Sequence, residues 1–199
     1  MDSAAYDKKD LRKKLRERRR SLTPYQRKQA AIALFNQLKR MPLLRKARSV
    51  ATYITNDGEI SPAHLSEWLW KKKTVVSLST LHPLGQNRLW FYSYTSSSLM
   101  RTNRYRILEP LGNFRERIAL EAIDVILTPL VGFDSLGNRL GMGKGFYDRT
   151  LTEFKNRQSG NTPRLIGIAF NEQEVSQLPT DDWDYPLTAI VTPSRTLYF

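Results

Sequence analysis

Glycines and cations are concentrated in one segment of the chain. Five of the ten glycines lie between residues 132 and 145, and Arg139 and Lys144 lie among them. Glycine lets the backbone adopt positive φ and lets a ligand come close to main-chain amides. An apolar run at 125–128 precedes the segment, a helix is expected to begin near Phe146, and amides at the start of a helix favour anions. The segment therefore predicts a loop that binds an anionic ligand such as a phosphate.

This glycine-rich segment matches neither of the common phosphate-binding fingerprints. A Walker loop requires Ser or Thr after Gly-Lys, where Gly145 stands in this chain. The dinucleotide fingerprint spaces its glycines as Gly-x-Gly-x-x-Gly, whereas this loop has Gly141-x-Gly143-x-Gly145. A wide turn around Gly137 and Asn138, with additional flexible glycines, is the purely structural alternative.

The sequence around the loop alternates strand and helix patterns from residue 49 onward. β-branched and aromatic residues predict a strand at 49–55, and Asn-Asp-Gly at 56–58 predicts a turn. A helix is expected next, with Ser61 as its cap and Pro62 at its first position. Such alternation indicates an α/β fold with a largely parallel central sheet flanked by helices. The other predicted elements are strands at 74–79, 89–94, 125–128, 165–169 and 189–192, a turn at 109–112 and a helix at 146–157.

The N-terminal quarter predicts two helices. Residues 8–20 contain no Gly or Pro and place Leu11 and Leu15 on one narrow apolar seam, which indicates a basic helix. The segment Thr23-Pro24-Tyr25-Gln26 has the form of a capping box and predicts the start of a second helix, which ends before Met41-Pro42. We expect a single domain, 1–199, in which a basic helical segment at 1–48 packs on an α/β core at 49–199.

The charge of the chain is concentrated in the same N-terminal quarter. The 199 residues (23.1 kDa) carry 32 Lys+Arg against 19 Asp+Glu, a formal net charge of +13. Residues 1–50 hold 16 of these cations and 4 of the acids, a net charge of +12. The excess predicts nucleic acid, a phosphorylated ligand or another polyanion as partner. The absence of cysteine excludes disulfides and thiol catalysis. Without a secretory or membrane-spanning segment, the expected compartment is the cytoplasm.

The complete string around the loop is more specific than its glycines. The sequence Arg-Leu-Gly-x-Gly-x-Gly-Phe-Tyr-Asp at 139–148, preceded by Pro-x-x-x-Phe-Asp at 129–134, resembles the signature of the 5-formyltetrahydrofolate cyclo-ligase family, also called 5,10-methenyltetrahydrofolate synthetases. The resemblance extends to the N-terminal helix, to 53–60 and to 178–192. Many members have Gly where Leu130 stands and Tyr where Phe146 stands, but neither departure removes a charge or a chelating group.

The resemblance implies a reaction and a set of site residues. The family uses ATP and Mg²⁺ to convert 5-formyltetrahydrofolate to 5,10-methenyltetrahydrofolate, so both cofactors are expected here. Arg139 and Lys144 are the expected catalytic cations. By matching position, the ATP-binding residues are Lys8, Arg12, Arg139, Leu140, Gly141, Met142, Gly143, Lys144, Gly145, Phe146 and Tyr147. The folate-binding residues are Ile54, Glu59, Met142, Gly143, Lys144, Gly145 and Phe146, and the Mg²⁺ ligands are Asp148 and Asp184.

Further expectations follow from the same resemblance. The folate substrate is expected to be polyglutamylated, and a monomer with no membrane and no specific nucleic-acid partner is favoured. Without the resemblance, Asp148 would be read as an acid that stabilises a helix start, and Asp184 as a solvated loop acid. Lys8 and Arg12 would be two charges in a solvated run, and Glu59 would merely precede the Ser61 cap.

Two other function classes remain open from the residues. The basic run at 8–20 suits an RNA-binding protein that contacts phosphates. A sugar-phosphate isomerase or an acyl-transfer enzyme on a related α/β fold would use the same glycine loop for phosphate, without ATP. Strict ATP dependence distinguishes a cyclo-ligase from the second class, and RNA affinity without a nucleotide effect would favour the first.

Overall fold

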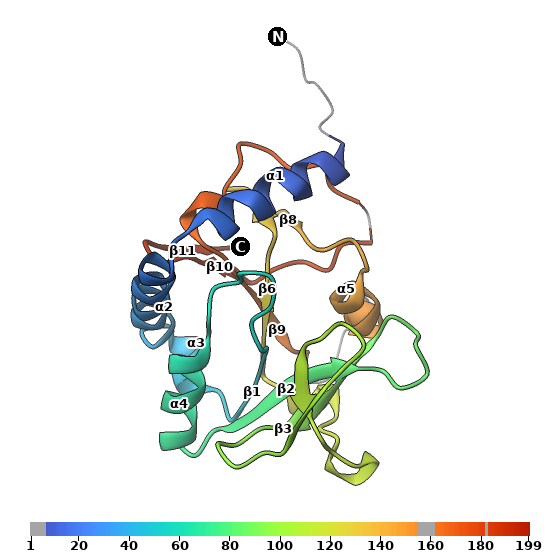
Figure 1. Ribbon diagram of the computed structural model, residues 1–199. Helices are drawn as coiled ribbons and strands as arrows, with labels where there is room; N and C mark the ends of the chain where they lie inside the picture. The colour runs from blue at the N-terminus through green and yellow to red at the C-terminus, as the bar shows by residue number, and fades with distance from the viewer. Residues whose placement is uncertain (1–6, 155–161, 182) are drawn as a thin grey trace.

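The structure, a computed structural model, describes residues 7–154, 162–181 and 183–199 (Figure 1). A seven-stranded sheet with the order β11-β10-β9-β6-β1-β2-β3 forms its centre. The five inner strands are parallel, and β3 and β11 pair antiparallel at the two edges. The bounds are β1 Ser49–Thr52, β2 Val75–Leu81, β3 Leu89–Ser93, β6 Val125–Pro129, β9 Arg164–Ile168, β10 Ala189–Val191 and β11 Thr196–Tyr198.

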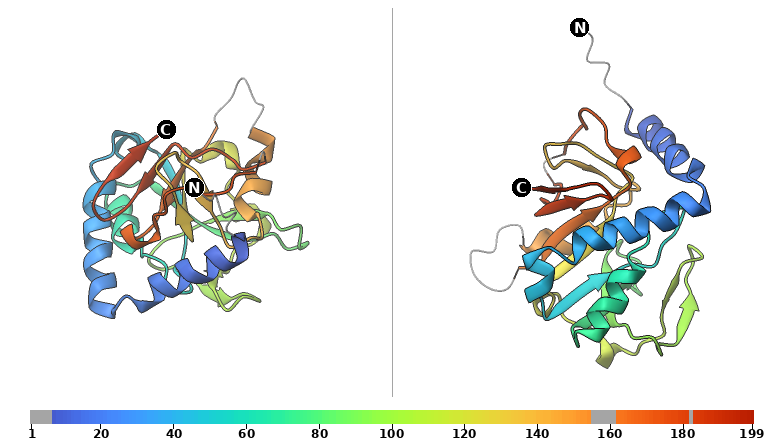
Figure 2. Two further views of the ribbon diagram at one scale, coloured as in Figure 1. Left: turned by 90° about the horizontal axis from the view of Figure 1, so that it is seen from above. Right: turned by 90° about the vertical axis from the view of Figure 1, so that its left-hand side faces the viewer.

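Helices cover both faces of this sheet, as predicted for an α/β fold. Helices α2 (Pro24–Leu38) and α4 (Ala63–Lys71) lie on one face, where Leu34 and Leu65 pack with Val50 and Val125. Helix α5 (Phe146–Leu151) lies on the other face, where Leu151 packs among the second core cluster. The two sides are seen in Figures 1 and 2. No helix of the described residues is both long and apolar enough to cross a membrane.

Helix α1 (Lys8–Ser21) does not cover a sheet face but crosses the end of the sheet, above β6 and β8 in Figure 1. Its two buried leucines, Leu11 and Leu15, pack against Val131, Leu140 and Leu178. The carboxyl ends of parallel strands lie at one edge, and ligands of open α/β sheets bind outside that edge. Helix α1 is therefore placed where a ligand site is expected.

Two small two-stranded sheets complete the structure. Strands β7 (Gly132–Phe133) and β8 (Arg139–Leu140) form a hairpin between β6 and the glycines that follow. Strands β4 (Met100–Thr102) and β5 (Leu108–Pro110) form a second hairpin. The short helices are α3 (Pro42–Lys46), η1 (Phe114–Glu116), η2 (Leu120–Ala122), η3 (Thr152–Phe154) and η4 (Asn171–Gln173).

Most predicted elements are confirmed, including the basic helix and the capping box, in which Gln26 donates its backbone N–H to Thr23 and Thr23 donates its own to the Gln26 side chain. Several boundaries differ from the prediction, and the strand expected at 49–55 ends at Thr52. The helix expected with Ser61 as its cap and Pro62 at its first position begins instead at Ala63, with Pro62 as its cap. The predicted turn at 109–112 overlaps strand β5, since proline is tolerated at the end of an edge strand. Helix α5 ends at Leu151, before η3, and the last predicted residues, 155–157, lie outside the described residues. The short helix α3 was not predicted.

Candidate active site

A cavity of about 690 Å³ opens at the carboxyl edge of the sheet, between α1, the glycine loop and the segment after residue 180. Its floor is the end of β6, at Thr128 and Pro129. Its walls hold the carboxylate of Glu59 and the cations of α1 and of the loop. The lining residues are Lys8, Arg12, Glu59, Thr128, Pro129, Leu130, Arg139, Leu140, Gly141, Met142, Gly143, Lys144, Gly145, Phe146, Tyr147, Asp148, Arg149, Thr152, Asp181, Trp183 and Asp184.

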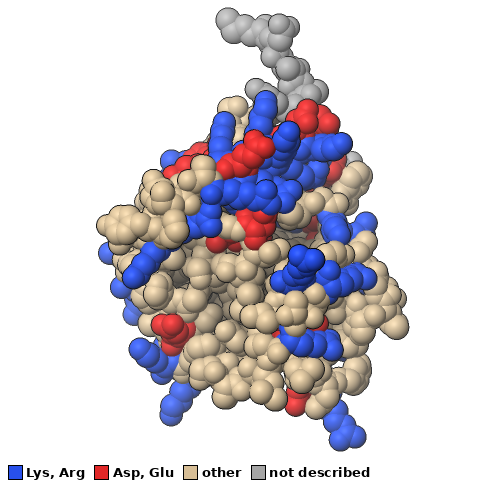
Figure 3. Space-filling view, in the orientation of Figure 1, with Lys and Arg blue, Asp and Glu red and all other residues tan. Residues whose placement is uncertain are grey.

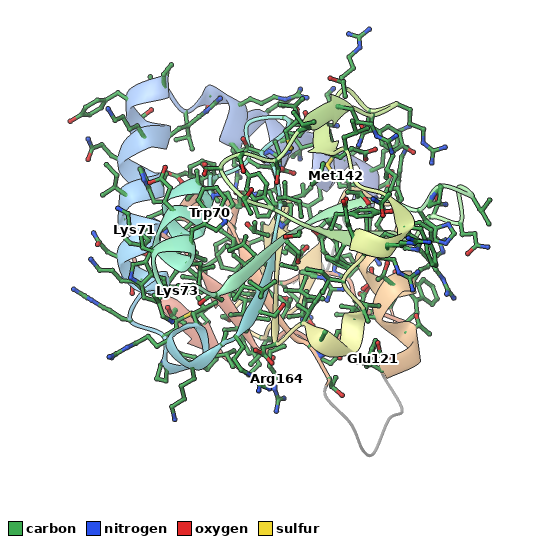
Figure 4. The ribbon with its side chains drawn as sticks, turned by 90° about the horizontal axis from the view of Figure 1, so that it is seen from below. Trp70, Lys71, Lys73, Glu121, Met142 and Arg164 are labelled. Atoms are coloured by element: carbon green, nitrogen blue, oxygen red, sulfur yellow. The ribbon has the colours of Figure 1, made fainter. Side chains whose placement is uncertain are left out.

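The glycine loop runs from the β7–β8 hairpin to the start of α5. Gly143 has φ +88° and Gly145, the cap of α5, has φ +61°, so both lie in the left-handed region that favours glycine. A Cβ atom at Gly143 would also lie 3.3 Å from Cζ of Arg12. The glycine loop is thus an exposed turn that ends at the start of a helix. Figure 4 labels Met142 of this loop. It lies apart from Glu121, in η2 before β6, and from Arg164, the first residue of β9.

Two cations of α1 face this loop and the segment after residue 180. Arg12 donates from Nε to the backbone carbonyl of Gly141 at 2.8 Å, and Lys8 Nζ lies 2.5 Å from Oδ2 of Asp181. Lysine and arginine side chains gather over α1 in the space-filling view, with acidic side chains among them (Figure 3). The structure thus brings Lys8 and Arg12 next to the loop from which they are separated by more than a hundred residues.

Arg139 is tied to Asp148 across the loop. Its guanidinium donates to Oδ1 of Asp148 and to the carbonyl of Tyr185, and its side chain is only 8% exposed. The backbone N–H of Tyr185 donates to the same carboxylate oxygen at 3.1 Å. Arg139 therefore orients Asp148, while Lys144 is the more accessible loop cation.

The two acids predicted as Mg²⁺ ligands line the same cavity. Asp148 accepts hydrogen bonds from the described residues only at Oδ1, and Asp184 accepts at Oδ2 from the backbone N–H of Asp181 at 3.2 Å. No group of three potential ligands is found among the described residues. Magnesium usually takes one or two carboxylates and completes its shell with water and phosphate oxygens, so this pair fits a Mg²⁺ ion carried by a nucleotide.

Glu59 reaches the cavity from the turn after β1. Its Oε2 accepts the backbone N–H of Asn56 at 3.0 Å. Burial raises the pKa of Glu59 to about 7, against the lowering effects of the Asn56 N–H and of Arg19. Burial likewise raises the pKa of Tyr147 to about 12, against the lowering effects of Ser79 and Thr128. A half-buried carboxylate whose Oε1 accepts no hydrogen bond from the described residues is suited to accept N–H donors from a ligand.

A tyrosine from the β4–β5 hairpin covers Lys144. The Lys144 ammonium lies 4.1 Å from the ring centroid of Tyr105, and the ring of Phe146 meets the same tyrosine edge-on at 6.3 Å. The neighbouring Lys144 ammonium lowers the pKa of the Tyr105 hydroxyl. The aromatic residue therefore holds the loop cation in place when no ligand does.

The structure brings together all but one of the residues expected from the sequence. Ile54 is half-buried and is absent from the cavity wall. Sequence reasoning missed Tyr105, Asp181 and Trp183. Asp181 and Trp183 belong to the acidic run that supplied Asp184, so proximity in sequence could have indicated them. Tyr105 lies in a polar stretch without a pattern, and only tertiary contact reveals it.

Known proteins resemble this chain over most of its length. The model of the 5-formyltetrahydrofolate cyclo-ligase family matches residues 4–193. The chain is 39% identical over 181 residues to the 5-formyltetrahydrofolate cyclo-ligase of Escherichia coli K12, covering 91% of this chain and 97% of that protein. It is 38% identical over 184 residues to the protein of the same name from Haemophilus influenzae, covering 92% and 96%.

Solved structures show the same architecture. The NMR structure of Aquifex aeolicus 5,10-methenyltetrahydrofolate synthetase matches with a TM-score of 0.80 and 30% identity, covering 96% of this chain and 92% of that one. A 5,10-methenyltetrahydrofolate synthetase from Mycoplasma pneumoniae shares the fold with a TM-score of 0.73, covering 94% and 99%. The comparisons give the RNA-binding alternative no support. By sequence match and fold, the chain belongs to the 5-formyltetrahydrofolate cyclo-ligase family.

Proposed function

We propose that the protein is a ligase that converts 5-formyltetrahydrofolate to 5,10-methenyltetrahydrofolate with release of ADP and phosphate. The observation that carries the proposal is the single cavity in which cations of α1 and of the glycine loop face Glu59 and two acids. Such a cavity offers cations to a triphosphate at one wall and a hydrogen-bond acceptor to a heterocycle at another.

The chemistry explains why ATP is needed. A formyl oxygen is a poor leaving group, so it attacks the γ-phosphorus and the bond from that phosphorus to the β-phosphate oxygen breaks, releasing ADP. Nitrogen N10 of the folate then attacks the activated carbon and loses its proton, and the C–O bond breaks with release of phosphate. The substrate supplies both nucleophiles. The protein contributes positioning and charge neutralisation, as in other phosphoryl transfers.

The ATP-binding role is assigned to α1 and the loop. Lys8 and Arg12 face the loop from Arg139 to Tyr147, and exposed amides and cations are the groups that bind phosphate oxygens. Lys144 can leave the Tyr105 ring for the transferred phosphoryl group, whereas Arg139 acts through Asp148. Asp148 and Asp184 would hold a Mg²⁺ ion that neutralises charge on the phosphates.

The folate-binding role is assigned to Glu59 and the loop residues from Met142 to Phe146. The pterin carries amino and ring N–H groups that a carboxylate accepts. Because burial stabilises the neutral form of Glu59, a ligand that donates to it would favour the ionised form and restore its charge. Ile54 has no support from the cavity wall and would act at most through packing.

The proposal extends to the context of the reaction. The net charge of +12 on residues 1–50 exceeds what one triphosphate requires and suits a polyglutamylated folate as substrate. We expect a monomeric, cytoplasmic enzyme with no specific nucleic-acid partner.

The test is the stoichiometry of ADP release. Purified protein supplied with Mg²⁺ and ATP should release one ADP for each 5-formyltetrahydrofolate consumed, and none without the folate. ADP release that does not depend on the folate contradicts the proposal. A filter-binding measurement with RNA at moderate salt, beside an ATP titration, addresses the RNA-binding alternative, and folate-independent turnover of sugar phosphates addresses the isomerase alternative.

A further inference from the structure

One arginine of α1 is buried while its neighbours are solvated. The Arg19 side chain is 1% exposed, whereas that of the adjacent Arg20 is 52% exposed. Burying a guanidinium is costly unless its donors are paired, so its partners must be well placed. The position of Arg19 on the inner side of α1 directs it to the carboxyl ends of the strands below.

Arg19 joins three segments of the chain. Its Nε donates to the carbonyl of Asp57 at 2.9 Å, and Nη2 donates to Oδ2 of Asp57 at 2.7 Å. Its Nη1 donates to the carbonyl of Leu130 at 3.4 Å, an oxygen that also accepts Nε2 of Gln173 at 2.6 Å. Helix α1, the turn after β1 and the segment after β6 therefore meet at one side chain.

Asp57 is shaped to receive this side chain. It adopts φ +52°, a left-handed conformation that aspartate tolerates better than most residues, and its carboxylate is shared by Arg16, Arg19 and Arg20. Burial alone would raise the pKa of Asp57, but the three guanidinium hydrogen bonds lower it to about 2. The same turn carries Glu59, because the backbone N–H of Glu59 donates to the carbonyl of Asn56 at 3.0 Å.

We propose that Arg19 and Asp57 are positioning residues that fix the turn bearing Glu59 against the helix bearing Lys8 and Arg12. The inference rests on the proposed role of Glu59 in folate binding. Neither residue lines the cavity, so both act through the residues that do. The pair would set the distance between the folate end and the nucleotide end of the site. It also gives a role to part of the cationic excess of α1 that ligands alone do not require.

The pair would also set the charge of Glu59. The groups that interact with Glu59 electrostatically are Arg19 from α1, Asp57 in its own turn, Tyr147 from α5 and Tyr53 at the end of β1. Arg19 lowers the pKa of Glu59 and Asp57 raises it. The two halves of one ion pair therefore act on the pKa of Glu59 with opposite sign.

The experiment measures the affinity for 5-formyltetrahydrofolate by calorimetry, without nucleotide, from about pH 5.5 to about pH 8.5, where a carboxyl with a raised pKa titrates. The variants are R19Q, D57N and R19K, with R20Q as the matched control, because Arg20 also pairs with Asp57 but makes no described contact with Leu130. E59Q reports whether Glu59 is responsible for the fall of affinity at low pH. Thermal melting of every variant establishes that it is folded.

The proposal predicts that the fall of folate affinity at low pH has its midpoint at higher pH in R19Q and at lower pH in D57N. R19K keeps the positive charge but cannot make the paired guanidinium hydrogen bonds to Asp57. The affinity should therefore fall by about tenfold or more at all pH values, while the midpoint of its pH dependence stays unchanged. R20Q leaves both the folate affinity and the midpoint of its pH dependence unchanged. If the midpoints of R19Q and D57N shift in the same direction, or do not shift although E59Q abolishes the pH dependence, the positioning role is overturned but the folate role of Glu59 is not. Unchanged affinity and pH dependence in E59Q would overturn the folate role of Glu59 and this proposal with it.

Discussion

The guanidinium of Arg12 donates a hydrogen bond to the backbone carbonyl of Gly141, 129 positions further along the chain. This bond, with the packing of Leu11 and Leu15 on the β7–β8 hairpin, closes the basic helix onto the glycine loop. The closeness restricts the loop, because a Cβ at Gly143 would lie 3.3 Å from Cζ of Arg12 and would require the guanidinium to shift by a few tenths of an ångström. Gly143 therefore has a structural reason to be glycine that Gly141, with open space at its Cβ position, does not share.

Two of these glycines give a matched pair of variants. Gly143→Ala places a Cβ at φ +88° and within 3.3 Å of Arg12, so we expect it to destabilise the ligand-free protein by about 1–2 kcal/mol. Gly141 has no positive φ and nothing within 4 Å of its Cβ position, so Gly141→Ala should change stability by less than about 0.5 kcal/mol. Denaturant unfolding of both variants checks the difference, and equal effects would contradict the assigned conformations.

Lys144 is expected to contact ATP. Lys144→Ala removes the accessible cation of the loop, and we expect KM for ATP to rise about tenfold to a hundredfold, the value of a charge-assisted hydrogen bond. Lys13→Ala is the control, because Lys13 is exposed on α1 and is not part of the cavity wall. Steady-state kinetics at saturating folate measure both, and unchanged ATP kinetics in Lys144→Ala would refute the assignment.

The two acids of the cavity are expected to act on Mg²⁺. Asp148→Asn and Asp184→Asn each remove a charge, so the Mg²⁺ concentration needed for half-maximal rate should rise by about tenfold or more, corresponding to about 1.4 kcal/mol. Asp148→Asn should also lower Tm, because Asp148 holds Arg139 and the Tyr185 N–H. Asp10→Asn, on the exposed side of α1, is the control. Mg²⁺ titrations that coincide with wild type would show that the acids are structural.

Glu59 predicts an unusual dependence of stability on pH. Its pKa is raised by burial from 4.5 to about 7, so the folded state binds a proton more tightly than the unfolded state does. The stabilisation from this proton is fully present below about pH 4.5 and is lost as the pH rises to about 7, with an upper bound of about 3 kcal/mol.

The measurement is the difference in unfolding free energy between wild type and Glu59→Gln, whose side chain does not titrate. Relative to the variant, wild type should lose stability between about pH 4.5 and about pH 7. Asp57 does not confound this window, because its pKa is lowered to about 2 and its contribution is lost only in stronger acid. A constant difference across the window would mean that Glu59 is not buried as described.

The sequence predicted those parts of the site that lie in one local motif. Arg139, Lys144 and Asp148 stand within ten residues, and their arrangement follows from a loop between a buried strand and a helix. The contacts of Arg19 with Asp57, and of Lys144 with Tyr105, could not be predicted, because each depends on how separate elements pack. Nothing in the run of cations at 8–20 distinguishes Arg19 from its solvated neighbours except its spacing from Leu15.

The strands of the central sheet were predicted from apolar runs of the sequence, whereas the errors arose in polar segments. Three of the five inner strands, β6, β9 and β10, are short and mainly apolar, as expected of a parallel sheet buried on both faces, whereas β1 and β2 also contain serine and threonine. The predicted turn at 109–112 was wrong because Glu109 is buried in β5, where Arg101 neutralises it at 3.0 Å. An acidic residue is more typical of a turn than of a strand, so the sequence indicates a turn. Only the buried ion pair seen in the structure shows that the segment is an edge strand.

The most direct test of the central claim is a spectrophotometric assay for 5,10-methenyltetrahydrofolate, whose extended conjugation distinguishes it from the substrate. Purified protein, 5-formyltetrahydrofolate and Mg²⁺ are mixed with and without ATP at neutral pH. The account predicts that the product's absorbance appears only with ATP and is strongly reduced in Lys144→Ala. Absence of the product with ATP, or its formation at the same rate without ATP, would contradict the account.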